Sequence, residues 1–100
     1  PKAIEYAEKA NRLSPDQPAI LDTLGVLLVE SGDKARGVEM LRKASMLAPS
    51  LPSIRLNLAK AYIATNQTDA AKKELEELAK LGDRFKAQGE VDQLMKEIAK

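Results

Sequence analysis

The chain has 100 residues, the size of a single folded domain, and its formal net charge of +1 gives no long-range field that would attract nucleic acid or an acidic membrane. It contains no cysteine and no histidine, which excludes disulfide bonds, thiolate metal sites and histidine-based catalysis and leaves the redox compartment open. The longest apolar run, residues 26–29, is far too short to span a membrane, and the 3% of aromatic residues leaves the core to leucine, isoleucine and alanine, which favours helices. We therefore expect an all-α domain with no nucleic-acid or membrane contact, no cofactor and no metal.

The first 82 residues carry a repeated pattern of helices. Residues 15–48 and 49–82 match position by position at an offset of 34 residues (49 − 15 = 34), with Leu24 opposite Leu58. Each repeat comprises two helices, and residues 1–14 form the second helix of an earlier repeat. The spacing of apolar residues predicts helices over residues 2–13, 18–31, 34–47, 52–65 and 68–81.

Short polar segments separate these predicted helices. Gly32 and Asn66 follow the first helix of each repeat, where both can adopt the left-handed backbone conformation that ends a helix. Asp33, Asp16 and Ser50 precede predicted helices, and we expect their side chains to cap the helix N-termini.

The pattern changes after Gly82, where residues 83–100 do not follow the repeat. We expect a loop and then a last helix over residues 89–99. Its apolar side chains share one face, because they stand at helical spacing: Val91, Leu94, Met95 and Ile98. A terminal helix with a polar outer face is what a repeat array needs to cover its last apolar surface.

A helix-turn-helix repeat of this length, with large and small apolar residues at fixed offsets, resembles the tetratricopeptide repeat. Four positions depart from the pattern. Leu21 and Arg55 stand where the family often has tryptophan, Leu78 replaces the usual alanine, and Asp83 replaces the closing proline. The resemblance implies one domain, residues 1–100, folded as a right-handed α-solenoid of helix-turn-helix repeats with a C-terminal capping helix. The residues that carry it are Leu21, Leu24, Gly25, Leu28, Gly37, Leu41, Ala44 and Pro49 in the first repeat, and Leu58, Ala59, Tyr62, Ala71 and Leu75 in the second.

The resemblance also implies a binding surface, because in this family the first helix of each repeat lines the concave face. It predicts a non-catalytic scaffold that binds a protein or peptide there. The alternative is a structural segment that caps a longer array and has no ligand of its own. The candidate partner-binding residues are Asp22, Thr23, Val26, Glu30, Ser53, Asn57, Lys60 and Ile63, with Ala19, Val29, Leu56 and Ala64 on the same face.

Asn57 stands where related domains use an amide to hold a peptide backbone, although a solvated helix residue is an equal interpretation. Some members of the family clamp a carboxylate with several lysines, arginines and asparagines. Asp22 and Val26 stand where such a clamp would need lysine and asparagine, so the sequence disfavours one.

A cluster of three glutamates is the strongest sign of catalysis or metal binding in the sequence: Glu74, Glu76 and Glu77. A solvated helix face explains it better. Lysines at i, i+4 spacing predict weak surface ion pairs, namely Lys72 with Glu76, Lys73 with Glu77, and Glu76 with Lys80. We therefore expect no catalytic residue, and no enzyme.

A narrower resemblance concerns the string AILDTLGVLLVESGD and the ending GDRFKAQGEVDQLMKEI. Both are similar to the C-terminal end of bacterial tetratricopeptide lipoproteins of the PEP-CTERM and exosortase sorting system. This resemblance implies a location in the bacterial cell envelope or periplasm, which the composition leaves unknown.

The chain begins at Pro1 inside a predicted helix, so we expect it to be a segment of a longer protein. Ala3, Ala7 and Ala10 would then face the absent first helix of their own repeat. With Ile4 and Tyr6 beside them, they predict a weak two-fold homodimer through the N-terminal helix.

Overall fold

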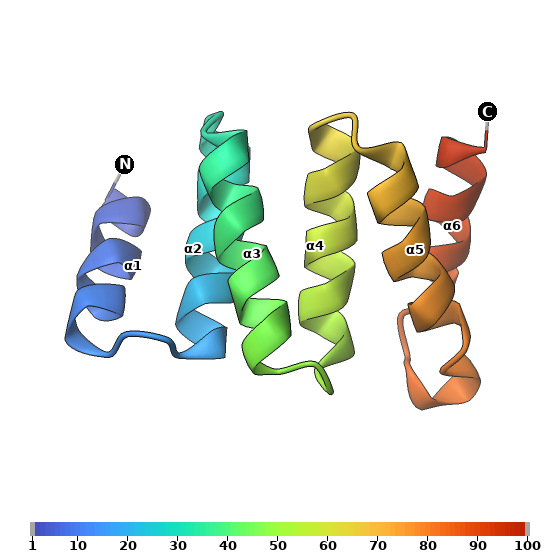
Figure 1. Cartoon of the computed structure of the whole chain (residues 1–100), viewed down its shortest axis with the longest axis horizontal. Coiled ribbons are helices and arrows are strands. Elements are labelled where there is room, and N and C mark those ends of the chain that lie inside the picture. The colour runs from blue at the N-terminus through green and yellow to red at the C-terminus, as the bar shows by residue number, and fades with distance from the viewer. Residues whose placement is uncertain (1, 100) are drawn as a thin grey trace.

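The computed structural model describes residues 2–99, and these residues contain six α-helices, a single turn of 3-10 helix and no strand. The helices lie side by side in an elongated array measuring 38 × 26 × 18 Å (Figure 1). This confirms the all-α solenoid predicted from the sequence. The elements are α1 (Lys2–Leu13), α2 (Pro18–Ser31), α3 (Lys34–Leu47), α4 (Pro52–Ala64), α5 (Thr68–Ala79), η1 (Gly82–Arg84) and α6 (Gln88–Ile98).

The first three predicted helices have the predicted bounds, but the later three do not. α4 ends at Ala64, α5 ends at Ala79, and α6 begins one residue early and ends at Ile98. The predicted loop after Gly82 contains the short η1 turn. Such shifts arise because helix ends fray, so a boundary is defined only to within one or two residues.

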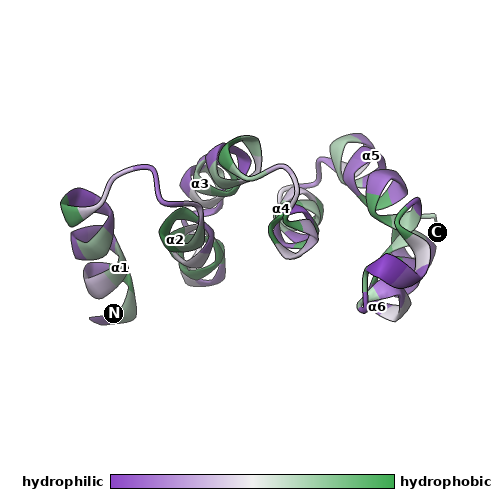
Figure 2. Cartoon of the chain, turned by 90° about the horizontal axis from the view of Figure 1, so that it is seen from below, coloured by the Kyte–Doolittle hydropathy of each residue, from purple (hydrophilic) through white to green (hydrophobic). Residues whose placement is uncertain are grey.

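The helices form two rows when viewed along their axes. α2 and α4 lie in one row, and α3 and α5 lie in the other (Figure 2). The contacts between elements follow the same order, because α2 packs on α3 and α4 on α5, and α2 also contacts α4 directly. The row formed by α2 and α4 is therefore the inner face of the array.

Backbone conformation, rather than side-chain capping, defines most helix ends. Gly32 has φ 102° and Asn66 has φ 62°, which confirms both as left-handed residues after a helix. The predicted side-chain caps are wrong. Gln17 and Leu51 occupy the N-cap positions of α2 and α4, and Asp33 occupies that of α3, but none of the three makes a side-chain cap hydrogen bond.

Asp16 and Ser50 are displaced from the N-cap positions because Pro18 and Pro52 begin the two helices. Proline preorganises the first helical turn, and the amide hydrogen that it lacks would have no partner within the helix. Asp16 has a positive φ of 63°, and its carboxylate pairs with Lys43 at 2.5 Å.

Within the first repeat, two glycines allow α2 and α3 to approach closely. A Cβ atom on Gly25 would lie 2.6 Å from Leu41 Cγ, and one on Gly37 would lie 2.7 Å from the carbonyl oxygen of Gly25. Both distances are too short for carbon contacts, so only glycine fits. The second repeat has Ala59 and Ala71 at the equivalent positions, and both are buried.

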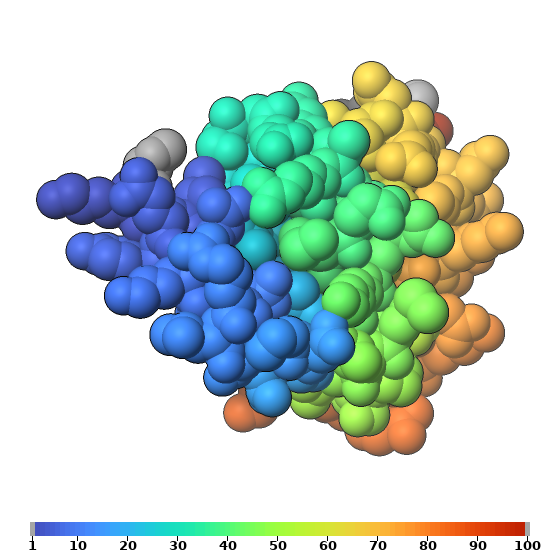
Figure 3. All heavy atoms as spheres, turned by 60° about the vertical axis from the view of Figure 1, so that its left-hand side comes forward, coloured from blue at the N-terminus to red at the C-terminus, as the bar shows by residue number. Residues whose placement is uncertain are grey.

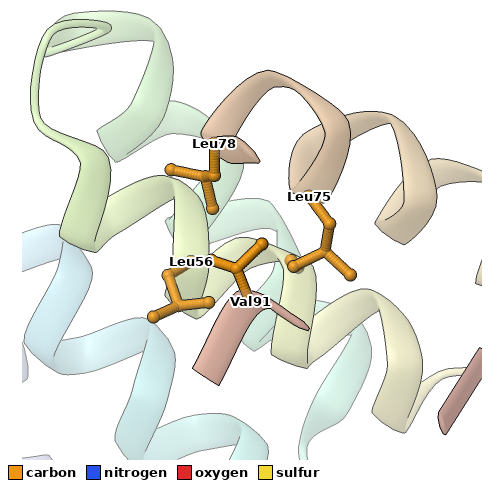
Figure 4. Packing of buried hydrophobic residues seen from close by; sticks show 5 residues of the cluster. Leu56, Leu75, Leu78 and Val91 are labelled. Atoms are coloured by element: carbon orange, nitrogen blue, oxygen red, sulfur yellow. The ribbon is translucent and has the colours of Figure 1, made fainter. Parts of the chain in front are cut away.

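A cluster of buried side chains holds α6 against the second repeat. Leu56, Leu75 and Leu78 surround Val91, which is fully buried (Figure 4). Gln88 Nε2 also donates a hydrogen bond of 2.7 Å to the carbonyl oxygen of Leu78, so the start of α6 is tied to the end of α5. α6 is thus fixed to the array by both apolar and polar contacts.

The N-terminal helix α1 lies at the other end of the array, drawn in blue in Figure 3. The prediction that Ala7 faces an absent helix is wrong, because Ala7 is buried against Leu24 and Leu28 of α2. Ala3 is exposed and Ala10 is half-buried. α2 therefore covers the part of the row of small residues on α1 that contains Ala7.

Candidate functional site

The inner face has a hollow of about 190 Å³ between α2 and α4. Leu41 of α3 forms its floor, so the hollow opens on the side of the array away from α3. Both flanking helices contribute apolar and polar side chains to it. The lining residues are Val26, Val29, Glu30, Leu41, Asn57, Lys60 and Ala61. We call the hollow that these seven residues line the inner groove.

The floor of the inner groove belongs to the hydrophobic core. Leu41 and Ala61 are buried, and they pack with Val38 and Leu58. Val26 and Val29 are half-buried beside them. Because the core fixes the floor, the hollow has a defined shape and can receive an apolar side chain without first rearranging.

A hydrogen bond between the two repeats orients the amide of Asn57. Asn57 Nδ2 donates to Asp22 Oδ1 at 3.0 Å, although the two residues are 35 positions apart. The carboxylate of Asp22 can only accept, which fixes the amide with its nitrogen toward α2. Within residues 2–99, the second amide hydrogen and the carbonyl oxygen of Asn57 have no protein partner.

An ion pair joins Lys60 of α4 to Glu90 at the start of α6, with Nζ and Oε2 2.5 Å apart. Both side chains are partly exposed, so solvent screens the pair. The pair affects the inner groove mainly because the carboxylate of Glu90 neutralises the positive charge of Lys60.

The family model for the tetratricopeptide repeat matches residues 28–96, well over half of the chain. This chain belongs to the tetratricopeptide-repeat family. No curated protein matches it closely enough to count as a relative. Tetratricopeptide repeats generally mediate protein–protein interaction and are typically non-catalytic scaffolds.

In this tetratricopeptide-repeat chain, four of the eight predicted partner-binding residues line the inner groove: Val26, Glu30, Asn57 and Lys60. Asp22 lies beside it through its hydrogen bond to Asn57. The other three lie outside the lining, with Thr23 and Ser53 exposed and Ile63 half-buried.

Leu56 is not available on the concave face, so that expectation is wrong. It is only 5% exposed and packs in the cluster around Val91 of α6. The last helix covers it because residues 82–87 turn the chain back onto α4 and α5. The repeat pattern holds no signal for that reversal.

Sequence reasoning also missed three residues of the site. From the sequence, Leu41 is identified only as a repeat residue and Ala61 is not singled out, although both reach the floor of the inner groove. Glu90 follows the loop whose path the sequence did not reveal. The periodic pattern identifies which residues are buried, but not which buried residues border a hollow.

Two of the three glutamates of α5 are engaged by neighbouring cations. Among residues 2–99, no three potential metal ligands come together. Glu74 pairs with Arg55 at 3.5 Å and Glu77 with Lys80 at 3.1 Å. The predicted i, i+4 pairs are wrong: none of the three forms among residues 2–99, and Lys80 pairs with Glu77 instead of with Glu76.

A larger hollow of about 420 Å³ lies between the α3–α4 turn and the end of α5. Its lining includes Arg55 and Glu77, whose charges are already engaged by Glu74 and Lys80. Arg84, also in the lining, donates to the carbonyl oxygen of Leu81. These internal contacts leave few groups for a ligand, so the smaller inner groove is the better candidate.

Proposed function

We propose that this chain is a non-catalytic scaffold that binds a protein segment or peptide in an extended conformation along its inner face. The observation that carries the proposal is the inner groove itself, which combines a preformed apolar floor with an oriented amide. Such a combination is typical of peptide sites, where an apolar anchor supplies affinity and a few polar groups fix orientation.

The apolar side chains and the amide of the inner groove would contact different parts of the partner. An apolar side chain of the partner would sit against Val26 and Ala61, while the free hydrogen and carbonyl oxygen of Asn57 would bond to the partner backbone. Thr23, Ser53 and Ile63 would contact the partner outside the hollow, on the same two helices.

The test is an NMR titration of the isotope-labelled chain with short capped peptides that contain one central leucine. We expect the largest shifts at the amides of Val26, Asn57 and Ala61. The double variant Val26→Ser with Asn57→Ala should lose most of this binding and still melt cooperatively. The control is Met46→Ser, which removes exposed apolar surface from α3 and should leave binding unchanged.

The proposal fails if the peptides shift resonances elsewhere, or if the double variant binds as well as the parent chain. Within residues 2–99, no helix is both long and apolar enough to cross a membrane.

A second candidate function is the structural cap, because α6 buries Val91 and covers Leu56 at the end of the array. A cap would have no ligand of its own. The same peptides can be titrated into this chain alone and into a longer protein that contains it. If the chain is only a cap, it will show no peptide binding at the inner groove. If it is a binding module, it will bind the peptides as the longer protein does.

The narrower resemblance to bacterial envelope lipoproteins supports a proposal about location. We propose that the protein acts in the cell envelope. Fractionation of cells that produce the whole protein, together with metabolic labelling by a fatty acid, tests both the compartment and the lipid. Recovery in the cytoplasm without label would contradict the proposal.

A further inference from the structure

We infer that the inner groove selects a cationic peptide segment, with two lysines or arginines flanking one apolar residue. This inference rests on the proposed function, since it names the chemistry of the partner that the same groove would bind. It differs from a carboxylate clamp, which needs the opposite charge on the scaffold.

The charges beside the groove are unbalanced toward the acidic side. Lys60 is neutralised by Glu90. Asp22 and Glu30 have no cationic partner within residues 2–99, and Asp22 contacts only the neutral amide of Asn57. The four ionisable groups therefore sum to −2 (−1 −1 −1 +1), although the whole chain carries +1. A groove of one sign attracts segments of the other.

The two unpaired carboxylates also define a spacing. Asp22 and Glu30 are eight positions apart on α2 (30 − 22 = 8), with Val26 midway between them. At 1.5 Å per residue this places them about 12 Å apart along the helix. An extended peptide rises about 3.3 Å per residue, so two cations about four residues apart would match them.

The same spacing puts an apolar residue of the peptide over the hollow. In an extended chain, residues i, i+2 and i+4 point to the same side. If cations at i and i+4 face Asp22 and Glu30, then the side chain at i+2 faces Val26 and the apolar floor. The expected motif is a cation, any residue, an apolar residue, any residue, and a second cation.

The experiment titrates three capped peptides of equal length into the labelled chain. The first contains Lys–Ser–Leu–Ser–Lys, the second contains Glu–Ser–Leu–Ser–Glu, and the third has the composition of the first with the two lysines adjacent. We expect the first to bind about three- to tenfold more tightly than either of the others at low salt, the range that rim charges give. Added salt should weaken the first most.

Two double variants test whether the preference depends on the carboxylates beside the groove or on the net charge of the whole chain. Asp22→Asn with Glu30→Gln removes both carboxylates and still leaves an oxygen to accept from Asn57. It should abolish the preference for the first peptide. Asp69→Asn with Glu76→Gln makes the same charge change on exposed residues of α5 and should preserve the preference.

The outcomes distinguish this inference from the proposed function. If the acidic peptide binds at the groove as tightly as the basic one, the charge selection is wrong and the binding face stands. If the adjacent lysines bind as well as the spaced ones, the register on Asp22 and Glu30 is wrong. If no peptide moves groove resonances, both the inference and the proposed function fall.

Discussion

Gly37 lies where α3 comes close to α2. Only the hydrogen atom that glycine carries in place of a Cβ atom fits between the two helices there. A Cβ atom at this position would lie 2.5 Å from Val29 Cγ2, 2.7 Å from the Gly25 carbonyl oxygen and 2.9 Å from the Val29 amide nitrogen. Two of these three contacts are with backbone, which cannot move aside without separating the helices.

We predict that Gly37→Ala costs about 1–3 kcal/mol of unfolding free energy, because overpacking outweighs the better helix propensity of alanine. Gly89→Ala is the matched control, since nothing lies within 4 Å of its Cβ position on α6. That variant should gain up to about 1 kcal/mol from propensity alone. Urea denaturation measures both, and equal effects at the two sites would refute the close approach of α2 and α3.

Tyr62 gives a residue-scale prediction about pH. Burial raises the pKa of Tyr62 above its ordinary value of 10.0, with Arg42 acting against this rise and Glu74 and Glu39 adding to it. The unfolded chain therefore loses this proton at a lower pH than the folded chain does. The contribution of Tyr62 to stability is complete below pH 10.0 and is lost as the pH rises through the raised pKa.

In Tyr62→Phe this alkaline loss should be smaller than in the parent chain, because no phenol remains to ionise at that position. The measurement is the unfolding free energy on either side of pH 10.0, taken as a difference between parent and variant. Tyr6→Phe, at an exposed position, serves as the comparison. A parallel alkaline loss in the parent and Tyr62→Phe would count against the burial effect.

At the scale of elements, α6 is held against the second repeat by the cluster around Val91. We predict that Val91→Ala costs about 1–3 kcal/mol, because it removes two methyl groups from a closed cluster. Hydrogen exchange should accelerate over α6 and the adjoining loop before it accelerates in α2 and α3.

Gln93→Ala on the exposed side of α6 is the control and should leave exchange unchanged. If Val91→Ala also leaves α6 protected, the packing of Figure 4 does not hold this helix in place. A detached α6 would expose Leu56 and release Lys60 from Glu90, so this element also governs the charge of the inner groove.

For the whole molecule, the open end of the array at α1 raises the question of self-association. Tyr6 is 69% exposed and Leu13 is 74% exposed, both on α1. The weak two-fold homodimer predicted from the sequence stays a prediction, now resting on these two side chains and the exposed Ala3 instead of on Ala7. Apolar surface of this kind favours contact between copies at high concentration.

Sedimentation equilibrium up to millimolar concentration should show a weak dimer that Tyr6→Glu abolishes. Met46→Glu is the control, because it places the same charge at a residue of α3 that is 79% exposed. A chain that stays monomeric throughout this range, or a dimer that Met46→Glu weakens equally, would show that α1 is not the contact.

The sequence determined the helices and their pairing into repeats. Leu24, Leu58 and their equivalents recur every 34 residues, and a periodic apolar stripe fixes which face of each helix is buried. Helix-ending residues such as Gly32 also act locally, through their own backbone preferences. Half of the predicted partner-binding residues line the groove for the same reason, since position in the repeat sets the inner face.

The polar contacts of the inner face depend on tertiary packing, which the repeat pattern does not specify. The bond between Asp22 and Asn57 joins neighbouring repeats, and the pair of Lys60 with Glu90 requires the loop after α5 to return α6 to α4. Long polar side chains have many rotamers and several partners within reach, so periodicity cannot choose among them. The packing of Val91 against Leu56 selects one path for that loop, and through it the charge of the groove.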